Sequence, residues 1–300
     1  MVVHADRLTK RFGRVDALRG LSFDVPESST FALVGANGAG KTTTIKVLMN
    51  ILEPTAGTAT VLDTNTRALS PRELARIGYV SEHQDMPSRM TVSAYIDYLR
   101  PFYPTWDRAL ETDILSHFRL PPDRRIRDLS HGMRMKMGLV CALAFRPALL
   151  VLDEPLSGLD PLIRDEVLDR LRRQAGDMTI LISSHELAEI ETVTTHVAFL
   201  DSGRLLFQEA LSDLAARVRF VRVSLQAAPS APVHPPAEWL DVRVDEYMLS
   251  FIDTRFSERD LRAKVAAVVG TVAHIDVEPV DLRTIYTSLA RAVRDGKASA

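Results

Sequence analysis

Cysteine is almost absent from this chain, because Cys141 is the only one in 300 residues. A single thiol cannot form an intramolecular disulfide, so a secreted fold held together by disulfides is excluded, and a reducing compartment is consistent with the composition. Cys141 lies among apolar neighbours in LVCALAF. We therefore expect it to be a small, buried side chain rather than a reactive thiol.

Long hydrophobic runs are also missing. The most apolar stretch, LVCALAFRPALLVL, is interrupted by Arg146 and Pro147, whereas a membrane-spanning helix needs about 20 apolar residues in a row. The first residues, MVVHADRLTKRFG, contain no apolar segment of the secretory type, so we expect no signal peptide. If the protein acts at a membrane, another chain must supply the spans.

Neither sign of charge dominates: 37 Lys and Arg stand against 39 Asp and Glu, which gives a formal net charge of -2. This balance argues against a surface that binds nucleic acid by bulk electrostatics, so we expect no nucleic-acid partner. The chain is 46% hydrophobic and long enough for one large domain and a smaller one. No cluster of Cys and His has the spacing of a structural metal site.

Four apolar segments have the composition of buried β-strands, and long helical patterns alternate with several of them. The strand segments are STFALVG, ALLVLDE, MTILISSH and HVAFLDSG, and the helical patterns cover 41–52, 91–100, 131–145 and 161–175. Continuous apolar strands that alternate with helices predict an α/β fold, with a mostly parallel sheet covered on both faces.

The composition of the sequence changes near residue 218. A strand-like VRFVRVSL is followed by the Pro- and Ala-rich stretch QAAPSAPVHPPAE, which reads as a long loop. Further strand and helix patterns follow it: DVRVDEYMLSFID, SERDLRAKVAAVVG, TVAHIDVE and DLRTIYTSLARAV. We expect residues 1–216 to form the main domain and residues 217–300 to form a small α+β domain.

A glycine-rich loop follows the first apolar strand. Its sequence, GANGAGKT, fits the phosphate-binding pattern G-x-x-x-x-G-K-[ST]. The glycines allow backbone N–H groups to converge on phosphate, and the helix that follows adds the positive end of its dipole. Lys41 is placed to reach the β- and γ-phosphates, and the Thr42 hydroxyl to bind Mg²⁺. The expected nucleotide-binding residues are Gly35, Ala36, Asn37, Gly38, Ala39, Gly40, Lys41, Thr42 and Thr43.

Two adjacent carboxylates end another apolar strand, in LLVLDEP. Like charges at the end of a buried strand must be offset by a cation or by solvent. Beside a phosphate loop we expect Asp153 to hold Mg²⁺ and Glu154 to polarise the attacking water. His185 follows a third apolar strand, in LISSHEL, where its ring can face the γ-phosphate.

Ser130 and Gly132 begin a long helix in DLSHGMRMKMGLV. A hydroxyl and bare backbone N–H groups at a helix start suit an anion, but on this segment alone an ordinary helix cap is the better interpretation of Ser130.

Taken together, these motifs resemble those of the ATP-binding subunit of an ABC transporter. The aromatic-rich segment MPSRMTVSAYIDYLRPFYPTWD and the closing EPVDLRTIYTSLAR resemble those of the ABC-2 exporter type. GANGAGKT matches Walker A, LSHGM the signature motif, LLVLDEP Walker B, SGLD the D-loop and His185 the switch histidine, while Phe12 is similar to the adenine-stacking aromatic of the A-loop. The resemblance implies a P-loop NTPase fold, with a RecA-like core, an antiparallel β subdomain and a helical subdomain at about 85–147. It also implies ATP and Mg²⁺ as cofactors, with Lys41, Glu154 and His185 as catalytic residues.

The sequence departs from the family pattern at three motifs. In the A-loop, Phe12 stands where tyrosine is commoner, which keeps the stacking face. Where the family usually has the Q-loop glutamine, this chain has Glu82, with Gln84 as the alternative. A carboxylate at this position can still contact Mg²⁺, so the expected metal-binding residues are Thr42, Asp153 and Glu82. In the signature motif, His131 replaces the usual glycine and Met133 replaces a polar side chain.

The resemblance also implies partners. In such ATPases Ser130 and Gly132 of one subunit contact the nucleotide of a second, so we expect a dimer, with a homodimer favoured. A separate integral membrane permease would place the protein at the cytoplasmic face of the cell membrane. The aromatic residues that follow the Q-loop are either a docking groove for that permease or the core of the helical subdomain: Tyr95, Tyr98, Phe102, Tyr103 and Trp106.

The expected function is ATP-driven transport, with export favoured by the resemblance. One alternative is a soluble ABC ATPase of translation or DNA repair, but those types usually carry two ATPase units or a long coiled-coil insertion, and this chain shows neither. The other alternative is a nucleotide-gated regulator with little ATPase activity, which the acidic Glu82 favours.

Overall fold

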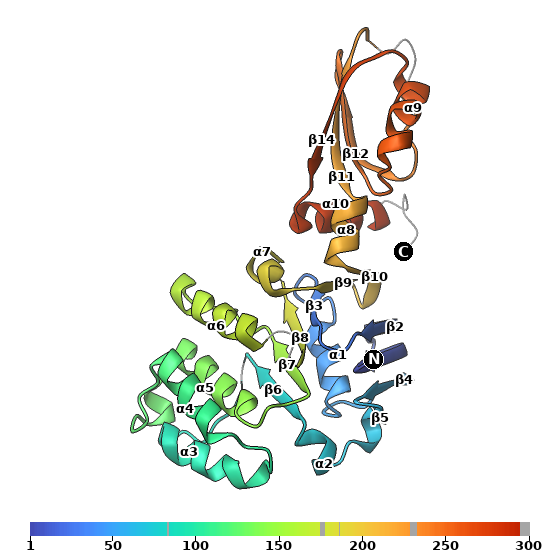
Figure 1. Cartoon of the computed structure of the whole chain (residues 1–300). Helices are drawn as coiled ribbons and strands as arrows, with labels where there is room; N and C mark the ends of the chain where they lie inside the picture. Colours follow the sequence, from blue (N-terminus) through green and yellow to red (C-terminus); the bar gives the residue numbers. More distant parts are fainter. Residues whose placement is uncertain (83, 175–177, 186, 229–232, 295–300) are drawn as a thin grey trace. The chain divides into compact units, whose positions relative to one another are not determined.

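The computed structural model describes residues 1–82, 84–174, 178–185, 187–228 and 233–294 (Figure 1). The chain divides into two compact units, Met1–Gln208 and Glu209–Ala300. This division falls before the boundary expected after residue 216, because Glu209 is bonded to Arg217 of the second unit. The guanidinium of Arg217 donates to Glu209 Oε2 at 2.6 Å and to the carbonyl oxygen of Thr254 at 2.6 Å.

A six-stranded sheet forms the centre of the first unit, in the order β10-β9-β3-β8-β7-β6. Its strands are β3 (Thr30–Val34), β6 (Ile77–Ser81), β7 (Leu149–Asp153), β8 (Thr179–Ser184), β9 (His196–Asp201) and β10 (Arg204–Ala210). The pairings of β3 with β8 and β9, and of β7 with β6 and β8, are parallel. Every residue of β3, β7 and β8 is buried, as the continuous apolar runs predicted. The carboxyl ends of these parallel strands therefore meet at one edge.

A second, antiparallel sheet lies on the other side of helix α1 (Lys41–Leu48). Its order is β2-β1-β4-β5, with β1 (Val3–Phe12), β2 (Val15–Val25), β4 (Ala56–Val61) and β5 (Thr64–Asn65). Residues of both sheets and of α1 share one hydrophobic core. The helix expected over 41–52 ends early because Asn50 adopts a left-handed conformation with φ 55°. The N–H groups of Ile51 and Leu52 then return to the carbonyl oxygen of Lys46, at 2.8 and 3.0 Å.

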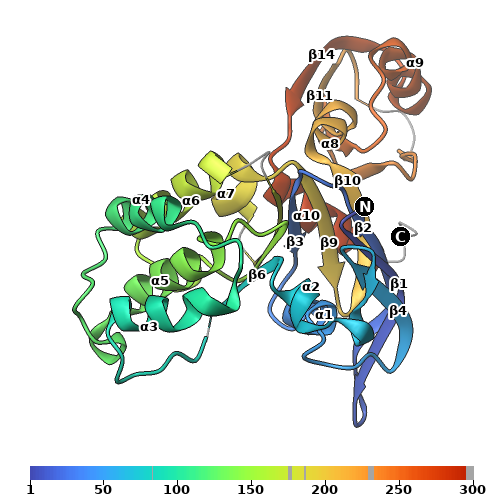
Figure 2. The same ribbon diagram turned by 60° about the horizontal axis from the view of Figure 1, so that its bottom comes forward.

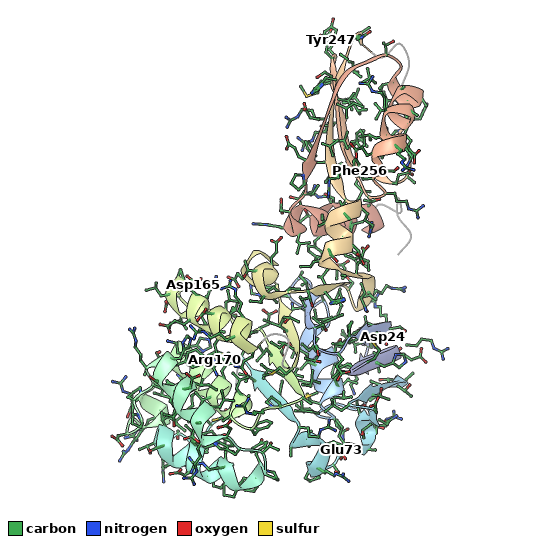
Figure 3. The ribbon with its side chains drawn as sticks, viewed as in Figure 1. Asp24, Glu73, Asp165, Arg170, Tyr247 and Phe256 are labelled. Atoms are coloured by element: carbon green, nitrogen blue, oxygen red, sulfur yellow. The ribbon has the colours of Figure 1, made fainter. Side chains whose placement is uncertain are left out.

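The remaining helices of the first unit are α2 (Pro71–Leu74), α3 (Val92–Leu99), α4 (Arg108–Phe118), α5 (His131–Leu143), α6 (Pro161–Gln174) and α7 (Leu187–Ile190), with 3-10 turns η1 (Thr66–Ala68), η2 (Arg100–Phe102), η3 (Ile126–Asp128) and η4 (Glu191–Val193). Of these, α3, α4, α5 and α6 gather on the side of β6 away from α1 (Figure 2). α5 packs on β6 and also contacts α3 and α4. Arg170 of α6, labelled in Figure 3, pairs with Asp113 of α4 at 2.6 Å. These contacts join the helices to one another and, through α5, to β6.

The second unit is an antiparallel sheet with helices, in the strand order β12-β13-β11-β14. Its elements are α8 (Leu211–Arg217), β11 (Arg219–Leu225), β12 (Trp239–Val244), β13 (Met248–Asp253), α9 (Glu258–Val269), β14 (Val272–Pro279) and α10 (Leu282–Arg294). Trp239 stacks on Phe251 with ring centroids 3.8 Å apart, and α9 adds Leu261 and Val265 to that core. Tyr247 is exposed between β12 and β13 (Figure 3). The α+β pattern expected here is thus present.

The Pro- and Ala-rich stretch expected to be a loop, 226–238, lies partly outside the described residues, since 229–232 are not among them. Its described parts contain no helix or strand. Within the described part of the chain, no helix combines the length and the apolar character needed to cross a membrane. The described residues likewise contain no cluster of three or more His, Cys, Asp or Glu able to hold a metal ion by themselves.

Candidate active site

The glycine-rich loop links β3 to α1, and its glycines are required by its geometry. Gly38 and Gly40 have φ values of 83° and 108°, which residues with a Cβ rarely adopt. A Cβ on Gly35 would lie 2.4 Å from the carbonyl oxygen of Leu200 in β9. The loop therefore packs on the sheet and turns directly into the helix that begins at Lys41.

Lys41 lies almost completely inside this loop, with 5% of its surface exposed. Its Nζ donates to the carbonyl oxygens of Gly35 and Ala36 at 2.7 and 3.2 Å. The same Nζ lies 3.0 Å from Glu154 Oε1. A buried ammonium is stable only with such partners, so the loop holds a fixed positive charge at its centre.

A pocket of about 360 Å³ opens over the loop. Its lining residues come from five separate parts of the sequence: Phe12, Ala17, Asn37, Gly38, Gly40, Lys41, Thr42, Thr43, Glu82 and Glu154. Phe12 is 47% exposed, and Lys10 Nζ lies 5.1 Å from the centre of its ring. The structure thus places a partly exposed aromatic ring and the phosphate loop on one pocket, while Gly35, Ala36 and Ala39 belong to the loop but do not line the pocket.

Glu154 contacts the two other expected catalytic residues, Lys41 and His185. Its Oε1 faces Lys41, and its Oε2 lies 2.8 Å from His185 Nδ1. Because a carboxylate only accepts, His185 Nδ1 carries the hydrogen in this contact. Glu154 itself has a left-handed backbone with φ 51°, a strained conformation that persists only when neighbouring bonds enforce it. The strand end therefore aims a carboxylate between an ammonium and an imidazole.

Asp153 is the other carboxylate of the pair, and it is 3% exposed. Its Oδ1 accepts from Thr42 Oγ1 at 3.1 Å and from Ser183 Oγ at 2.7 Å. Burial raises the pKa of Asp153, and these two hydroxyls oppose that rise. The structure therefore brings Thr42 and Asp153 together, as expected of two ligands to one ion.

Ser183 is a residue that sequence reasoning missed. Besides donating to Asp153, its Oγ accepts the backbone N–H of Glu154 at 2.9 Å. One hydroxyl at the end of β8 therefore orients both carboxylates at the end of β7. The signal that was available is a polar pair, Ser183 and Ser184, ending an otherwise apolar strand.

Comparison with known proteins agrees with this geometry. Residues 18–157 match the ABC transporter family. The bacitracin transport ATP-binding protein BcrA of Enterococcus faecalis is 30% identical over 223 residues, which cover 73% of this chain and 72% of that protein. The daunorubicin resistance ATP-binding protein DrrA2 of Streptomyces coeruleorubidus is 31% identical over 238 residues, 77% of this chain and 74% of that protein.

The chain belongs to the ABC transporter ATP-binding protein family. Among solved structures, one described as the ATP binding subunit of an ABC transporter has a TM-score of 0.66 and 27% identity, over 72% of this chain and 92% of that one. A dimeric ATP-binding cassette with ADP and Pi shares the fold, with a TM-score of 0.62 and 20% identity over 70% of this chain and 98% of that one. The P-loop NTPase fold is therefore confirmed, and this ABC ATP-binding protein is an ATPase.

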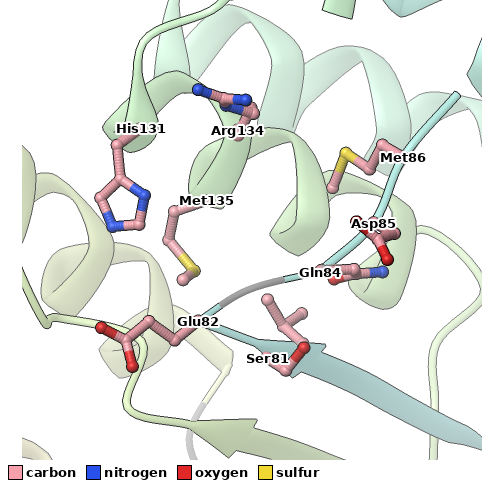
Figure 4. Close-up of a pocket in the computed structure, with 9 residues that line it drawn as sticks. Ser81, Glu82, Gln84, Asp85, Met86, His131, Arg134 and Met135 are labelled. Carbon is pink, nitrogen blue, oxygen red and sulfur yellow. The ribbon is translucent and has the colours of Figure 1, made fainter. Parts of the chain in front are cut away.

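Of the two Q-loop candidates of this ABC protein, only Glu82 lines the phosphate pocket, and both line a neighbouring pocket. Glu82 lines the phosphate pocket, where its Oε1 accepts from Ser157 Oγ at 2.8 Å and its N–H donates to the carbonyl of Asp153 at 3.0 Å. Gln84 lines a neighbouring pocket of about 280 Å³ against α5 (Figure 4). Gln84 Oε1 is buried, and no described residue donates to it. Position alone therefore favours Glu82 as the group beside the nucleotide.

The signature residues do not line the phosphate pocket of their own chain. Ser130 is the N-cap of α5, and its Oγ accepts the N–H of Met133 at 3.2 Å. Gly132 is buried, and a Cβ there would lie 2.5 Å from Ile163 Cδ1. Within one chain, the helix-cap alternative therefore describes Ser130, and a side chain at Gly132 would have to displace the end of the Ile163 side chain.

The five aromatic residues that follow the Q-loop separate into two groups. Tyr95 is 9% exposed, and Tyr103 stacks on Phe145 with centroids 4.1 Å apart, with Trp106 beside it. These three belong to the helical subdomain core. Tyr98 and Phe102 are 54% and 60% exposed and contact each other edge to face at 5.5 Å. Only this pair remains as a candidate docking surface among the five.

Proposed function

We propose that this ATPase binds ATP between the Phe12 ring and the glycine-rich loop, and hydrolyses it by water attack at the γ-phosphate. Phe12 supplies a stacking face for the base, and the loop amides with Lys41 bind the phosphates. The observation that carries the proposal is the position of Glu154. Its carboxylate lies in the pocket between Lys41 Nζ and His185 Nδ1, at 3.0 and 2.8 Å.

Glu154 is proposed as the general base for the attacking water. The ion pair with Lys41 and a hydrogen bond from His185 hold its two oxygens, so its orientation is fixed before substrate binds. When ATP enters, its phosphates offer Lys41 a stronger partner than the neutral carbonyls of the loop. One Glu154 oxygen is then released toward water. His185 keeps its Nδ1–H on Glu154 and presents its other nitrogen to the γ-phosphate.

The residues present fit a magnesium ion. Mg²⁺ prefers hard oxygen ligands, and the Thr42 hydroxyl lies 3.1 Å from a carboxylate oxygen of the buried Asp153. The burial that raises the pKa of Asp153 favours a bound cation as its counter-charge. We propose Thr42 and Asp153 as ligands, with Glu82 nearby, and a bound Mg²⁺ would offset charge on the transferring phosphoryl group.

A second ATPase subunit is proposed to complete the site. Ser130 and Gly132 stand at the start of α5, where helix N–H groups suit an anion, and neither residue lines the pocket of its own chain. A head-to-tail dimer would place them on the nucleotide of the partner. Hydrolysis would then open the dimer, so the ATP cycle would become a cycle of closure and opening.

A separate membrane permease is proposed as the output of that cycle. The exposed pair Tyr98 and Phe102 offers an apolar contact for it. Export is the favoured direction, since relatives include proteins named for bacitracin transport and daunorubicin resistance. A permease partner of this kind would place the protein at the cytoplasmic face of the membrane. Residues 1–216 would act as the ATPase domain, and 217–300 as an accessory domain.

The test is phosphate release by the purified chain, compared with Glu154→Gln. We expect the substitution to lower kcat more than a hundredfold, because the amide cannot take the proton of water. Phosphate release that is equally low in both proteins, even with the membrane subunit present, would favour a nucleotide-gated regulator instead.

Dimer formation has its own measurement. Glu154→Gln with MgATP should elute from a sizing column as a dimer, because bound ATP is no longer removed. The same variant with ADP is the matched control and should remain a monomer. A variant that stays monomeric while loaded with ATP would contradict the two-subunit site.

A further inference from the structure

Ser157, in the turn after Glu154, is held from two sides by residues that are unusual for the family. His131 Nε2 lies 3.1 Å from the carbonyl oxygen of Ser157. The hydroxyl of Ser157 donates to Glu82 Oε1 at 2.8 Å. Figure 4 shows His131 and Glu82 as linings of one pocket, His131 from α5 and Glu82 from the segment after β6. Glu82 and His131, which both depart from the family motifs, therefore contact the same serine.

Ser157 also closes the turn that begins at Glu154. Its N–H donates to the carbonyl oxygen of Glu154 at 3.2 Å. Glu154 has the left-handed φ of 51°, and a residue with a Cβ keeps such a conformation only when surrounding bonds determine it. At the start of the turn, the Glu154 N–H donates to Ser183 Oγ at 2.9 Å, and this bond helps to hold the conformation. At its end the bonds to Ser157 serve the same purpose.

The imidazole of His131 is well placed to donate to the carbonyl oxygen of Ser157. A carbonyl oxygen only accepts, so Nε2 must carry a hydrogen, which both the neutral Nε2–H tautomer and the imidazolium provide. The next residue, Gly158, has φ 65°, and a Cβ built on it would lie 3.8 Å from the His131 ring. The ring therefore packs along the turn as well as bonding to it. Glycine, the residue usual at this signature position, has no side chain for either contact.

We infer that His131 is a positioning residue for hydrolysis: through Ser157, and together with Glu82, it fixes the turn that orients the Glu154 carboxylate. The inference rests on the proposed role of Glu154. It makes the start of α5 and the end of β7 one connected unit within a single chain. Movement of α5 would then be transmitted to the general base through the chain of contacts His131, Ser157 and Glu154.

The test compares kcat and KM for ATP in His131→Ala and His131→Gln. A mispositioned catalytic group chiefly lowers the chemical step, so we expect His131→Ala to lower kcat about tenfold with less than a twofold change in KM. His131→Gln keeps an N–H donor near the position of Nε2 and should recover most of kcat. Failure of Gln to recover activity, or a change confined to KM, would overturn the inference.

His117 provides a matched control. Its Nε2 also lies within hydrogen-bond distance of a backbone carbonyl oxygen, that of Glu166, at 3.2 Å, and it joins α4 to α6. His117→Ala therefore removes the same kind of contact between helical elements, away from Glu154. We expect a thermal shift similar to that of His131→Ala and a kcat within twofold of the wild type. Equal kcat losses in the two variants would mean that His131 is merely structural.

A second measurement separates positioning from direct contact with a partner's nucleotide. In the Glu154→Gln background, where no general base remains, adding His131→Ala should leave the MgATP-driven dimer unchanged. A dimer weakened more than fivefold would show that His131 contacts nucleotide and would overturn the inference. If the Glu154→Gln parent does not dimerise, the two-subunit proposal fails, and the kcat comparison still decides the role of His131. If the wild type hydrolyses no ATP, the failure lies in the proposed reaction rather than in this positioning contact.

Discussion

Ser183→Ala is the sharpest test of how the two carboxylates are held. The substitution removes a 2.7 Å donor from Asp153 Oδ1 and leaves the N–H of Glu154 without its 2.9 Å acceptor. A hydrogen bond to a charged group contributes about 1.5–3 kcal/mol, and an unsatisfied buried N–H costs about 1–3 kcal/mol. We expect a loss of about 3 kcal/mol in unfolding free energy at neutral pH, since the two effects add only partly.

The unfolding free energy lost in Ser183→Ala should be larger at neutral pH than in acid. Burial raises the folded-state pKa of Asp153 above its ordinary value of 3.8, and Ser183 opposes that rise. The folded protein therefore binds this proton more readily than the unfolded chain, and ionisation of Asp153 costs stability as the pH rises through the folded pKa. Without Ser183 that cost is larger above the folded pKa and disappears below 3.8. The difference between wild type and variant should therefore be smaller near about pH 4 than near about pH 7.

The assay is urea unfolding followed by Trp106 fluorescence in a Trp239→Phe background, because Trp239 lies in the second unit. Ser29→Ala is the matched control: Ser29 is 4% exposed and donates to one neutral carbonyl oxygen, that of Pro26, at 2.6 Å. It should cost about 1 kcal/mol at both pH values. A Ser183→Ala loss below that of the control, or one equal at both pH values, would refute the account of the carboxylate pair.

Three further predictions concern other parts of the molecule. Lys41→Met should weaken binding of a fluorescent ATP analogue more than about tenfold, because the phosphates lose a charge-assisted partner; unchanged affinity would contradict the placement of the phosphates. Cys141, whose pKa burial raises to about 12, should not react with a thiol reagent in the native state and should react fully in urea. Asp107→Asn should lower the Tm at neutral pH, because backbone N–H groups of α4 and Arg146 hold the pKa of Asp107 below 3.8. That stability is present above the unfolded-state pKa and is lost as the pH falls through the folded one, so the Tm difference should shrink in acid; a constant difference would contradict it.

Much of the first unit could be predicted from the sequence, for reasons visible in particular segments. The apolar runs of β3, β7 and β8 are buried throughout, so their composition alone indicated a parallel sheet. The phosphate loop was equally recognisable, because residues with a Cβ rarely adopt the φ of 108° found at Gly40, and a Cβ at Gly35 would lie 2.4 Å from the carbonyl oxygen of Leu200. These constraints act over a few neighbouring residues and therefore leave a mark in the local sequence.

The contacts between distant segments could not be predicted in this way. Ser183 lies 30 residues from Asp153, and the polar pair Ser183 and Ser184 does not show by itself which distant carboxylates it orients. The convergence of His131 and Glu82 on Ser157 was equally hidden, because it depends on α5 packing against β6 and on the turn after β7. The aromatic segment also needed the tertiary structure, which buries Tyr103 against Phe145 and leaves Tyr98 and Phe102 exposed.

The sequence by itself thus determined the chemistry that this chain carries: a loop for triphosphate, a pair of carboxylates and a histidine, each at the end of an apolar strand. Parallel pairing brings those strand ends to one edge, so their proximity followed from the strand pattern. Only the tertiary structure decided which oxygen faces which nitrogen, since packing between segments far apart in the chain sets those distances. It is this packing that places Glu154 between Lys41 and His185.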